Sequence, residues 1–199
     1  IDTRLDMPLE RFLDVFNDGW NKQSFVEDEE PGEIDWQGEN PGYVKDVGVE
    51  ILRCYHRELA PKVMPLAVEL PLEKTLDNVL LRGRIDLIKD SGIPLDWKTA
   101  KRRRPQGDLD RDLQPTVYTI LLGGPSSFEF HFLLKTKVPV AEASITHRTQ
   151  RDIDWFLKEL LPKAAAQIEA GIFPPNPTGY LCSSDYCAFY DVCGRPRQF

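Results

Sequence analysis

The sequence predicts an α/β protein, and three observations carry this prediction. Apolar residues recur at helical spacing in residues 8–22 and again in residues 42–60. Residues 63–98 contain instead short runs of β-branched residues and leucine, broken by turn residues. After residue 110 a helical stretch, two alternating strands and a second helical stretch follow. Helices and strands therefore share one chain, and no internal repeat is visible.

The first 61 residues are expected to supply two helices joined by a loop. The stretch PLERFLDVFNDGWNK, residues 8–22, places its apolar side chains on one helix face. The acidic stretch EDEEPGEIDW that follows is typical of a loop. A second apolar stripe runs through residues 42–60 and stops before Pro61, because proline cannot continue a helix.

Residues 63–98 are predicted to form a three-stranded antiparallel meander. The strands are the runs MPLAVELPLE, NVLLRGRIDLI and IPLDW, and the turn residues KDSG separate the second run from the third. Strands that are joined by such short turns pair in antiparallel fashion.

The second half of the chain returns to helices and strands. Residues 110–122 are predicted to be a helix, which tolerates Pro115 only in its first turn. FEFHFLLKT and VPVAEASIT are predicted strands with alternating character. Thr149, followed by Asp152, predicts the start of a long final helix that ends at Gly171 and is kinked at Pro162.

Length and composition exclude several classes of protein. With 199 residues, 41% of them hydrophobic and 29% charged, the chain can bury a core without disulfide bonds. No apolar stretch is long enough to span a bilayer and no signal peptide is visible, so we expect no membrane segment. A net charge of -7 argues against a surface that wraps nucleic acid everywhere. One local basic run, KTAKRRR at residues 98–104, is compatible with nucleic-acid binding.

The densest group of potentially catalytic residues lies in residues 83–100. Asp86 would end one strand, and Asp96 and Lys98 would project from one face of the next, because side chains alternate with a period of two. The hairpin would then place Asp86 beside Asp96, and two close carboxylates repel unless a cation such as Mg²⁺ lies between them. Lys98 could then orient the attacking water and neutralise charge on a phosphodiester. A lone D-x-K pattern is more often a pair of solvated strand charges.

The order and spacing of several motifs distinguish this group from a chance pattern. The chain reads G-x-x-D at residues 83–86, nine further residues, D-x-K-T at residues 96–99 and Q-x-x-x-Y at residues 114–118. A cysteine group follows near the C-terminus. From about Val44 to Cys193 the pattern resembles the RecB-like branch of the PD-(D/E)XK nuclease superfamily, which includes phage and Cas-type exonucleases.

The resemblance implies a central mixed β-sheet flanked by helices, as in the restriction-endonuclease-like core. It also implies a site for Mg²⁺ or Mn²⁺, with Asp86, Asp96 and the main-chain carbonyl of Trp97 as ligands and Lys98 as the catalytic lysine.

Two motifs around that site add further candidates. Gln114 and Tyr118 lie four residues apart on one helix face, and in the resembled branch this motif faces the active site and the DNA. The alternative is that Tyr118 packs in the core. Glu69, in the strand before Asp86, is a candidate acid for a second metal or a water, or equally a solvent-facing strand residue.

The basic residues just past Lys98 are candidates for contacts with DNA phosphates. The alternative is that these side chains only face solvent and bind nothing, as most runs of charged residues do. The candidates are Lys101, Arg102, Arg103 and Arg104.

Three of the four cysteines, Cys182, Cys187 and Cys193, lie in the segment CSSDYCAFYDVC. In RecB-like nucleases this position holds three ligands of an iron–sulfur cluster, so the resemblance implies such a cluster, of the [4Fe–4S] type. Zinc is the alternative metal, since thiolates suit both, and the spacing between the first two cysteines is longer than the family's usual one. Cys54 would be the fourth ligand, or a small buried apolar residue on its helix. Nothing in the sequence indicates the oxidising compartment that a disulfide requires.

We expect a single nuclease domain over residues 1–199. It would comprise an N-terminal helix and acidic loop (1–41), a nuclease core (42–171) and a cysteine-rich tail (172–199). The resembled branch usually carries an N-terminal G-x-x-x-H helix, often with a cysteine before it. Neither is clear here, since His56 lacks the glycine at the required place. We therefore expect the missing segment to precede Ile1.

The function implied by the resemblance is that of a metal-dependent DNA exonuclease, which cuts near DNA ends in repair, recombination or phage DNA processing. The expected partners are single- or double-stranded DNA ends and a helicase or recombinase. The expected location is the cytoplasm of a bacterial or phage-infected cell. Two alternatives are a catalytically idle DNA-end-binding module and a zinc-bound scaffold with no nucleic-acid role.

Overall fold

The computed structural model describes residues 7–22, 36, 38–173, 182–184 and 186–193. The chain divides into two compact units, Ile1–Asp154 and Trp155–Phe199. The first unit contains the whole β-sheet that the described residues form. No helix within the described ranges combines the length and the apolar character needed to cross a membrane.

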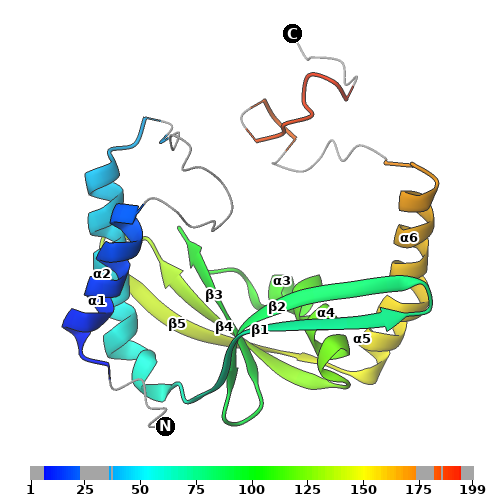
Figure 1. Cartoon of the computed structure of the whole chain (residues 1–199), viewed down its shortest axis with the longest axis horizontal. Coiled ribbons are helices and arrows are strands. Elements are labelled where there is room, and N and C mark those ends of the chain that lie inside the picture. Colours follow the sequence, from blue (N-terminus) through cyan, green and yellow to red (C-terminus); the bar gives the residue numbers. More distant parts are fainter. Residues whose placement is uncertain (1–6, 23–35, 37, 174–181, 185, 194–199) are drawn as a thin grey trace. The chain divides into compact units, whose positions relative to one another are not determined.

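A five-stranded sheet with the order β1-β2-β3-β4-β5 forms the centre of the first unit (Figure 1). The predicted meander is confirmed as its first three strands, and β4 and β5 continue the sheet. The strand bounds are β1 Pro65–Leu76, β2 Val79–Lys89, β3 Pro94–Ala100, β4 Ser126–Leu134 and β5 Val140–Arg148.

Strand direction reverses between neighbouring strands at every junction of the sheet but one. All neighbouring strands are antiparallel except β3 and β4, which pair in parallel. A parallel pair needs a crossover connection, and α3 (Gln106–Asp110) and α4 (Leu113–Leu122) supply it. The mixed sheet flanked by helices is therefore confirmed.

One face of β4 forms the core beneath the crossover helices. Phe128, Phe130 and Phe132 alternate along the strand and are fully buried. They pack with Leu109 of α3 and Tyr118 of α4. Burial of each phenylalanine stabilises the fold by about 2 kcal/mol, so this cluster holds the crossover against the sheet.

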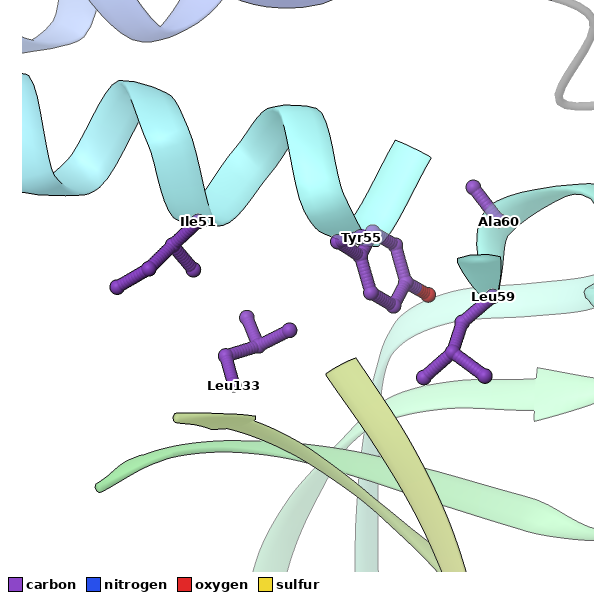
Figure 2. Close-up of a cluster of buried hydrophobic side chains, with 5 residues drawn as sticks. All are labelled: Ile51, Tyr55, Leu59, Ala60 and Leu133. Carbon is purple, nitrogen blue, oxygen red and sulfur yellow. The ribbon is translucent and has the colours of Figure 1, made fainter. Parts of the chain in front are cut away.

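The opposite face of the sheet packs against α2 (Pro41–Glu58). Figure 2 shows this second cluster, which side chains of α2 and of the turn after it form with Leu133 of β4. Its members are Ile51, Tyr55, Leu59, Ala60 and Leu133.

Helix α1 (Leu9–Lys22) adds a further layer by packing on α2 (Figure 1). The phenyl ring of Phe16 lies so close to Gly48 that a Cβ atom at this glycine would approach the ring to 2.8 Å. Gly48 therefore sets the distance between the two helices.

The helix starts follow the signals in the sequence. The side chain of Asn40 accepts a hydrogen bond from the N–H of Tyr43 at the start of α2. Asp112 caps α4, and Pro115 lies in the first turn of that helix, as predicted. The helix α2 ends before the short 3₁₀ turn η1 (Ala60–Lys62), which contains Pro61.

The predicted final helix is not continuous. It begins as predicted, because Asp152 accepts a hydrogen bond from the N–H of Thr149 at 2.7 Å at the start of α5 (Gln150–Trp155). A π-helical turn, η2 (Phe156–Leu160), then separates α5 from α6 (Leu161–Glu169). The irregularity thus lies before Pro162, which occupies the first turn of α6, where its missing N–H costs no hydrogen bond.

Candidate active site

Asp86 of β2 and Asp96 of β3 lie close together where these two strands pair. The register aligns Leu87 with Leu95, so the two aspartates occupy opposing positions one residue further on. The N–H of Trp97 donates a hydrogen bond to Oδ2 of Asp86 at 3.2 Å. The side chain of one strand therefore contacts the backbone of the other.

Asp96 is a buried carboxylate, only 4% exposed. Its Oδ1 accepts a hydrogen bond from Nε2 of Gln114 at 2.6 Å. Its Oδ2 lies 2.7 Å from Nζ of Lys98 as an ion pair, but it has no hydrogen bond of good angular geometry. Burial raises the pKa of Asp96 above its usual range, and the charge of Asp86 raises it further, while Lys98 and Gln114 act in the opposite direction.

Alternation along β3 separates the polar side chains from the apolar anchor of the strand. Asp96 and Lys98 pair in register with Phe130 and Phe132, on the face that the crossover helices cover. Trp97 points to the other face, where its ring meets Tyr55 of α2 edge-on with centroids 6.2 Å apart. Trp97, which lies between Asp96 and Lys98, therefore anchors β3 to α2 through the opposite face of the sheet.

Gln114 reaches Asp96 because the start of α4 is fixed by a network around Asp112. Oδ1 of Asp112 accepts a hydrogen bond from the backbone N–H of Gln114 at 2.9 Å. Oδ2 of Asp112 forms an ion pair with Arg104 at 2.7 Å. The loop after β3 and the helix that carries Gln114 are thereby joined.

Arg148 reinforces the same loop from β5. It is 3% exposed, and its guanidinium donates to the carbonyls of Leu109 and Asp112 at 2.9 and 2.7 Å and to the hydroxyls of Thr116 and Thr146. Burial lowers its pKa, against the effect of nearby aspartates. Arg148 was not predicted from the sequence, since it lies just beyond the predicted strand. Only an extension of the alternation through residue 148 could have indicated that its side chain is buried.

Comparison with known proteins identifies the superfamily of the chain. The sequence profile described as "PD-(D/E)XK nuclease superfamily" matches residues 4–194. The chain belongs to the PD-(D/E)XK nuclease superfamily. A search of curated proteins finds no significant match.

A solved structure shares the fold of this superfamily member. The protein "Putative exonuclease" from Eubacterium rectale has a TM-score of 0.55 and 16% sequence identity, and the match covers 96% of this chain and 71% of that one. At this identity the likeness supports the fold. The protein SSO0001 has a TM-score of 0.42 at 16% identity, over 64% of this chain and 59% of its own, which is too low to support an argument.

PD-(D/E)XK nucleases generally use divalent metals such as Mg²⁺, and the residues at β2 and β3 fit such an ion. Hard divalent cations prefer carboxylate and carbonyl oxygens. Asp86 and Asp96 offer these oxygens side by side, and Oδ2 of Asp96 is buried without a hydrogen bond. The described part of the chain contains no group of three or more His, Cys, Asp and Glu side chains that could hold a metal. A metal at Asp86 and Asp96 therefore needs main-chain or water ligands in addition.

Among the described residues, no hydrogen bond joins Tyr118 to either Asp86 or Asp96. Its hydroxyl donates to the carbonyl of Arg84 at 2.6 Å, and its ring stacks on Phe128 with centroids 5.8 Å apart. Gly83 allows this approach, because a Cβ there would lie 2.7 Å from the ring of Tyr118. The ring thus occupies the core position that the sequence left open as the alternative.

Glu69 lies on the exposed outer strand β1. Its carboxylate is 3.8 Å from the guanidinium of Arg84, and both side chains are exposed. The backbone of Glu69 has a φ of 50°, which is unusual for a residue other than glycine. This placement corresponds to the solvent-facing alternative.

The four basic residues past Lys98 fall into two pairs. Lys101 and Arg102 are exposed and form no ion pair among the described residues. Arg103 pairs with Glu142 at 3.2 Å, and Arg104 pairs with Asp112. Two of the four residues that were predicted to bind phosphates thus already form ion pairs within the protein.

None of the four cysteines, all of which lie among the described residues, forms a disulfide bond. Cys54 is buried on α2 and donates a hydrogen bond to the carbonyl of Pro139 at 3.4 Å. In the second unit, Cys182 and Cys187 are half-buried and Cys193 is exposed. No metal-holding group appears among the described residues, so the structure gives the predicted iron–sulfur cluster no support.

A second buried polar network lies on the α2 face of the sheet and was missed by the sequence reading. Glu129 accepts hydrogen bonds from Lys89 at 3.0 Å and from Nε2 of His131 at 2.6 Å. The other ring nitrogen of His131 lies 3.3 Å from the hydroxyl of Tyr55. Burial raises the pKa of Tyr55 to about 12. The run FEFHFLL was a usable signal, because a strand buried on both faces must also bury its Glu and His.

Proposed function

We propose that this chain is a metal-dependent nuclease that hydrolyses phosphodiester bonds of DNA, with Asp86, Asp96 and Lys98 in its active site. The observation that carries the proposal is the pair of adjacent carboxylates, one of them buried and incompletely hydrogen-bonded, with a lysine 2.7 Å away. Such an arrangement is unfavourable for folding alone and favourable for binding a cation.

Each residue has a distinct role in this proposal. Asp86, Asp96 and the main-chain carbonyl of Trp97 would hold Mg²⁺ or Mn²⁺, and the ion when bound supplies Lewis-acid stabilisation of charge on the phosphoryl group. Gln114 fixes the orientation of Asp96 through the 2.6 Å hydrogen bond to Oδ1. The side chain of Lys98 is 36% exposed. Its ammonium group would leave the ion pair with Asp96 and bind the attacking water and a phosphate oxygen instead.

DNA ends are the proposed substrate, with exonucleolytic action in repair, recombination or phage DNA processing beside a helicase or recombinase. Two considerations support this finer proposal. The motifs resemble those of RecB-like exonucleases, and a protein named "Putative exonuclease" shares the fold. Lys101 and Arg102 are exposed beside the site and are proposed to contact phosphates.

The test is a cleavage assay on end-labelled single- and double-stranded DNA with Mg²⁺, Mn²⁺ or EDTA. Lys98→Ala should lose cleavage by at least about 100-fold, since it removes a group that acts on the reacting atoms, while DNA binding is retained. Lys163→Ala is the matched control, because this lysine is exposed and pairs only with Glu159 among the described residues. Cleavage by Lys98→Ala at the control's rate would remove Lys98 from the active site.

An unmodified chain that binds DNA ends but cleaves with neither metal would instead be the idle end-binding module. Internal cuts in a circular substrate would contradict exonucleolytic action while leaving the nuclease proposal intact. The same assay thus separates the coarse proposal from the finer one.

The iron–sulfur cluster at Cys182, Cys187 and Cys193, with Cys54 as fourth ligand, stays a prediction of the resemblance. Protein made without oxygen should then be brown, with iron and acid-labile sulfide. Cys187→Ser should bleach it, and Cys54→Ser should do so only if Cys54 is a ligand. Colourless protein with stoichiometric zinc would assign the thiolates to zinc instead.

A further inference from the structure

The β1–β2 hairpin carries two exposed arginines in line with the candidate active site. Arg82, Arg84 and Asp86 occupy every second position of β2, so their side chains project from the same face of the strand. Successive members of this row are about 7 Å apart. The side chains of Arg82 and Arg84 are 72% and 69% exposed.

A shallow groove of about 520 Å³ lies along this part of the hairpin. Both arginines border it, and the strand face continues from there toward Asp86. The lining residues are Pro71, Leu72, Glu73, Arg82, Gly83 and Arg84.

The arginines are only loosely engaged within the protein. Arg82 pairs with Glu73 at 3.3 Å and Arg84 with Glu69 at 3.8 Å, and all four side chains are well exposed. Exposed ion pairs of this kind contribute little to stability, whereas arginine binds a phosphate through two parallel charge-assisted hydrogen bonds. Exchange of a glutamate for a phosphate therefore costs the fold very little.

The hairpin is fixed to the helix that also orients Asp96. Tyr118 of α4 donates to the carbonyl of Arg84 at 2.6 Å, and Lys74 of β1 donates to the carbonyl of Ile120 at 3.2 Å. The same helix carries Gln114, which binds Asp96. The arginine row and the candidate metal ligands are thus held on one scaffold.

We propose that Arg82 and Arg84 form a phosphate track that guides one nucleic-acid strand along β2 to Asp86 and Asp96. This inference rests on the proposed nuclease function and adds a substrate class to it. A single row of cations spaced about 7 Å apart matches successive phosphates of an extended single strand. Glu69 and Glu73 flank the row and repel a second phosphate backbone, so the track favours single-stranded over duplex DNA.

The experiment measures binding separately from cleavage. The double variant Arg82→Gln/Arg84→Gln is made in the Lys98→Ala background, and binding to a fluorescent single-stranded oligonucleotide is followed by anisotropy in EDTA. We expect about tenfold weaker binding and a salt slope lower by about 1.4, the value for two lost phosphate contacts on a single strand. Duplex binding should change less.

The matched control is Arg53→Gln/Arg57→Gln, which makes the same change in net charge at two exposed, glutamate-paired arginines of α2. This control should bind as its parent does. Circular dichroism and thermal melting verify that both double variants are folded. Equal binding by the two double variants, or an equal loss on duplex DNA, would overturn the track.

The remaining outcome concerns the proposed function. A wild-type chain that does not cleave under Mg²⁺ or Mn²⁺ would overturn the nuclease proposal, while a selective loss of single-strand binding in the arginine variant would still support the track. Absence of binding to any oligonucleotide would overturn both.

Discussion

Asp96 and Glu129 are buried carboxylates on the neighbouring strands β3 and β4, and their environments are opposite. Glu129 is 6% exposed, and hydrogen bonds from His131 and Lys89 lower its pKa to about 2 against the effect of burial. Asp96 is buried to the same degree, yet its pKa is raised, chiefly by burial. The pKa of a buried carboxyl group is therefore raised on one face of the sheet and lowered on the other.

The difference separates a residue that stabilises the fold from one that is available to a ligand. Both oxygens of Glu129 have donors of good geometry, so its charge is compensated where it lies. Asp96 keeps one buried oxygen without a hydrogen bond and has a second carboxylate beside it. A bound cation would give the unpaired oxygen of Asp96 a partner, whereas both oxygens of Glu129 already have one.

The largest expected effect separates activity from stability at Asp96. Asp96→Asn should lower cleavage by at least about 100-fold, because it removes a proposed metal ligand. In EDTA its melting temperature should equal or exceed that of wild type, since the substitution removes a buried charge of raised pKa. Mn²⁺ should raise the melting temperature of wild type only. A variant that melts well below wild type in EDTA would make Asp96 a structural residue like Glu129.

The next effect concerns Glu129. Glu129→Ala should lower the free energy of unfolding by about 3 kcal/mol, because it leaves the buried His131 and the half-buried Lys89 without their partner. Urea denaturation measures this loss, and Glu58→Ala, which removes an exposed pair with Arg57, is the control. A loss no larger than the control's would mean that the network is not needed for stability.

A smaller effect is the pH dependence that Glu129 produces. Its pKa falls from 4.5 to about 2 on folding, so its stabilisation is fully present above pH 4.5 and is lost as the pH falls from 4.5 to 2. The difference in unfolding free energy between wild type and Glu129→Gln should therefore shrink over this range. Urea titrations at pH 6, 4 and 3, at about constant ionic strength, check the prediction, and a constant difference would contradict it.

The smallest expected effect is at Tyr118. Tyr118→Phe keeps the ring on Phe128 and removes the hydrogen bond to the carbonyl of Arg84, so stability should fall by about 1 kcal/mol. Cleavage should change little. Tyr43→Phe, at an exposed tyrosine, is the control. A large loss of cleavage with unchanged stability would instead return the hydroxyl to the DNA-facing role that the resemblance implies.

Local signals predicted most of the fold. The meander, the cap at the start of α5 and the position of Pro115 follow from residues that are close in the sequence. The proximity of Asp86 and Asp96 follows equally from a short hairpin. Spacing along the chain is sufficient for these features, because turn chemistry and period-two alternation fix them.

Long-range partners explain what the sequence did not predict. Arg148 binds carbonyls near residue 110, and Glu129 meets Lys89 on a strand that is distant in the sequence, so local alternation can indicate that these residues are buried but not which partners they bind. The engagement of Arg103 by Glu142 has the same cause. The π-helical turn η2 and the short helix α3 are equally absent from the periodicity.

The parallel pairing of β3 with β4 also has a consequence for how the chain folds. The β1–β2 hairpin is closed by a short turn and can form early, whereas β4 can join β3 only after the whole crossover has been ordered. Gln114 lies in that crossover, and Asp96 lies on β3, so their hydrogen bond forms only in this late, non-local step. A partly folded chain can therefore present the arginine hairpin before Gln114 has reached Asp96, and under the proposed function nuclease activity would emerge only when folding is nearly finished.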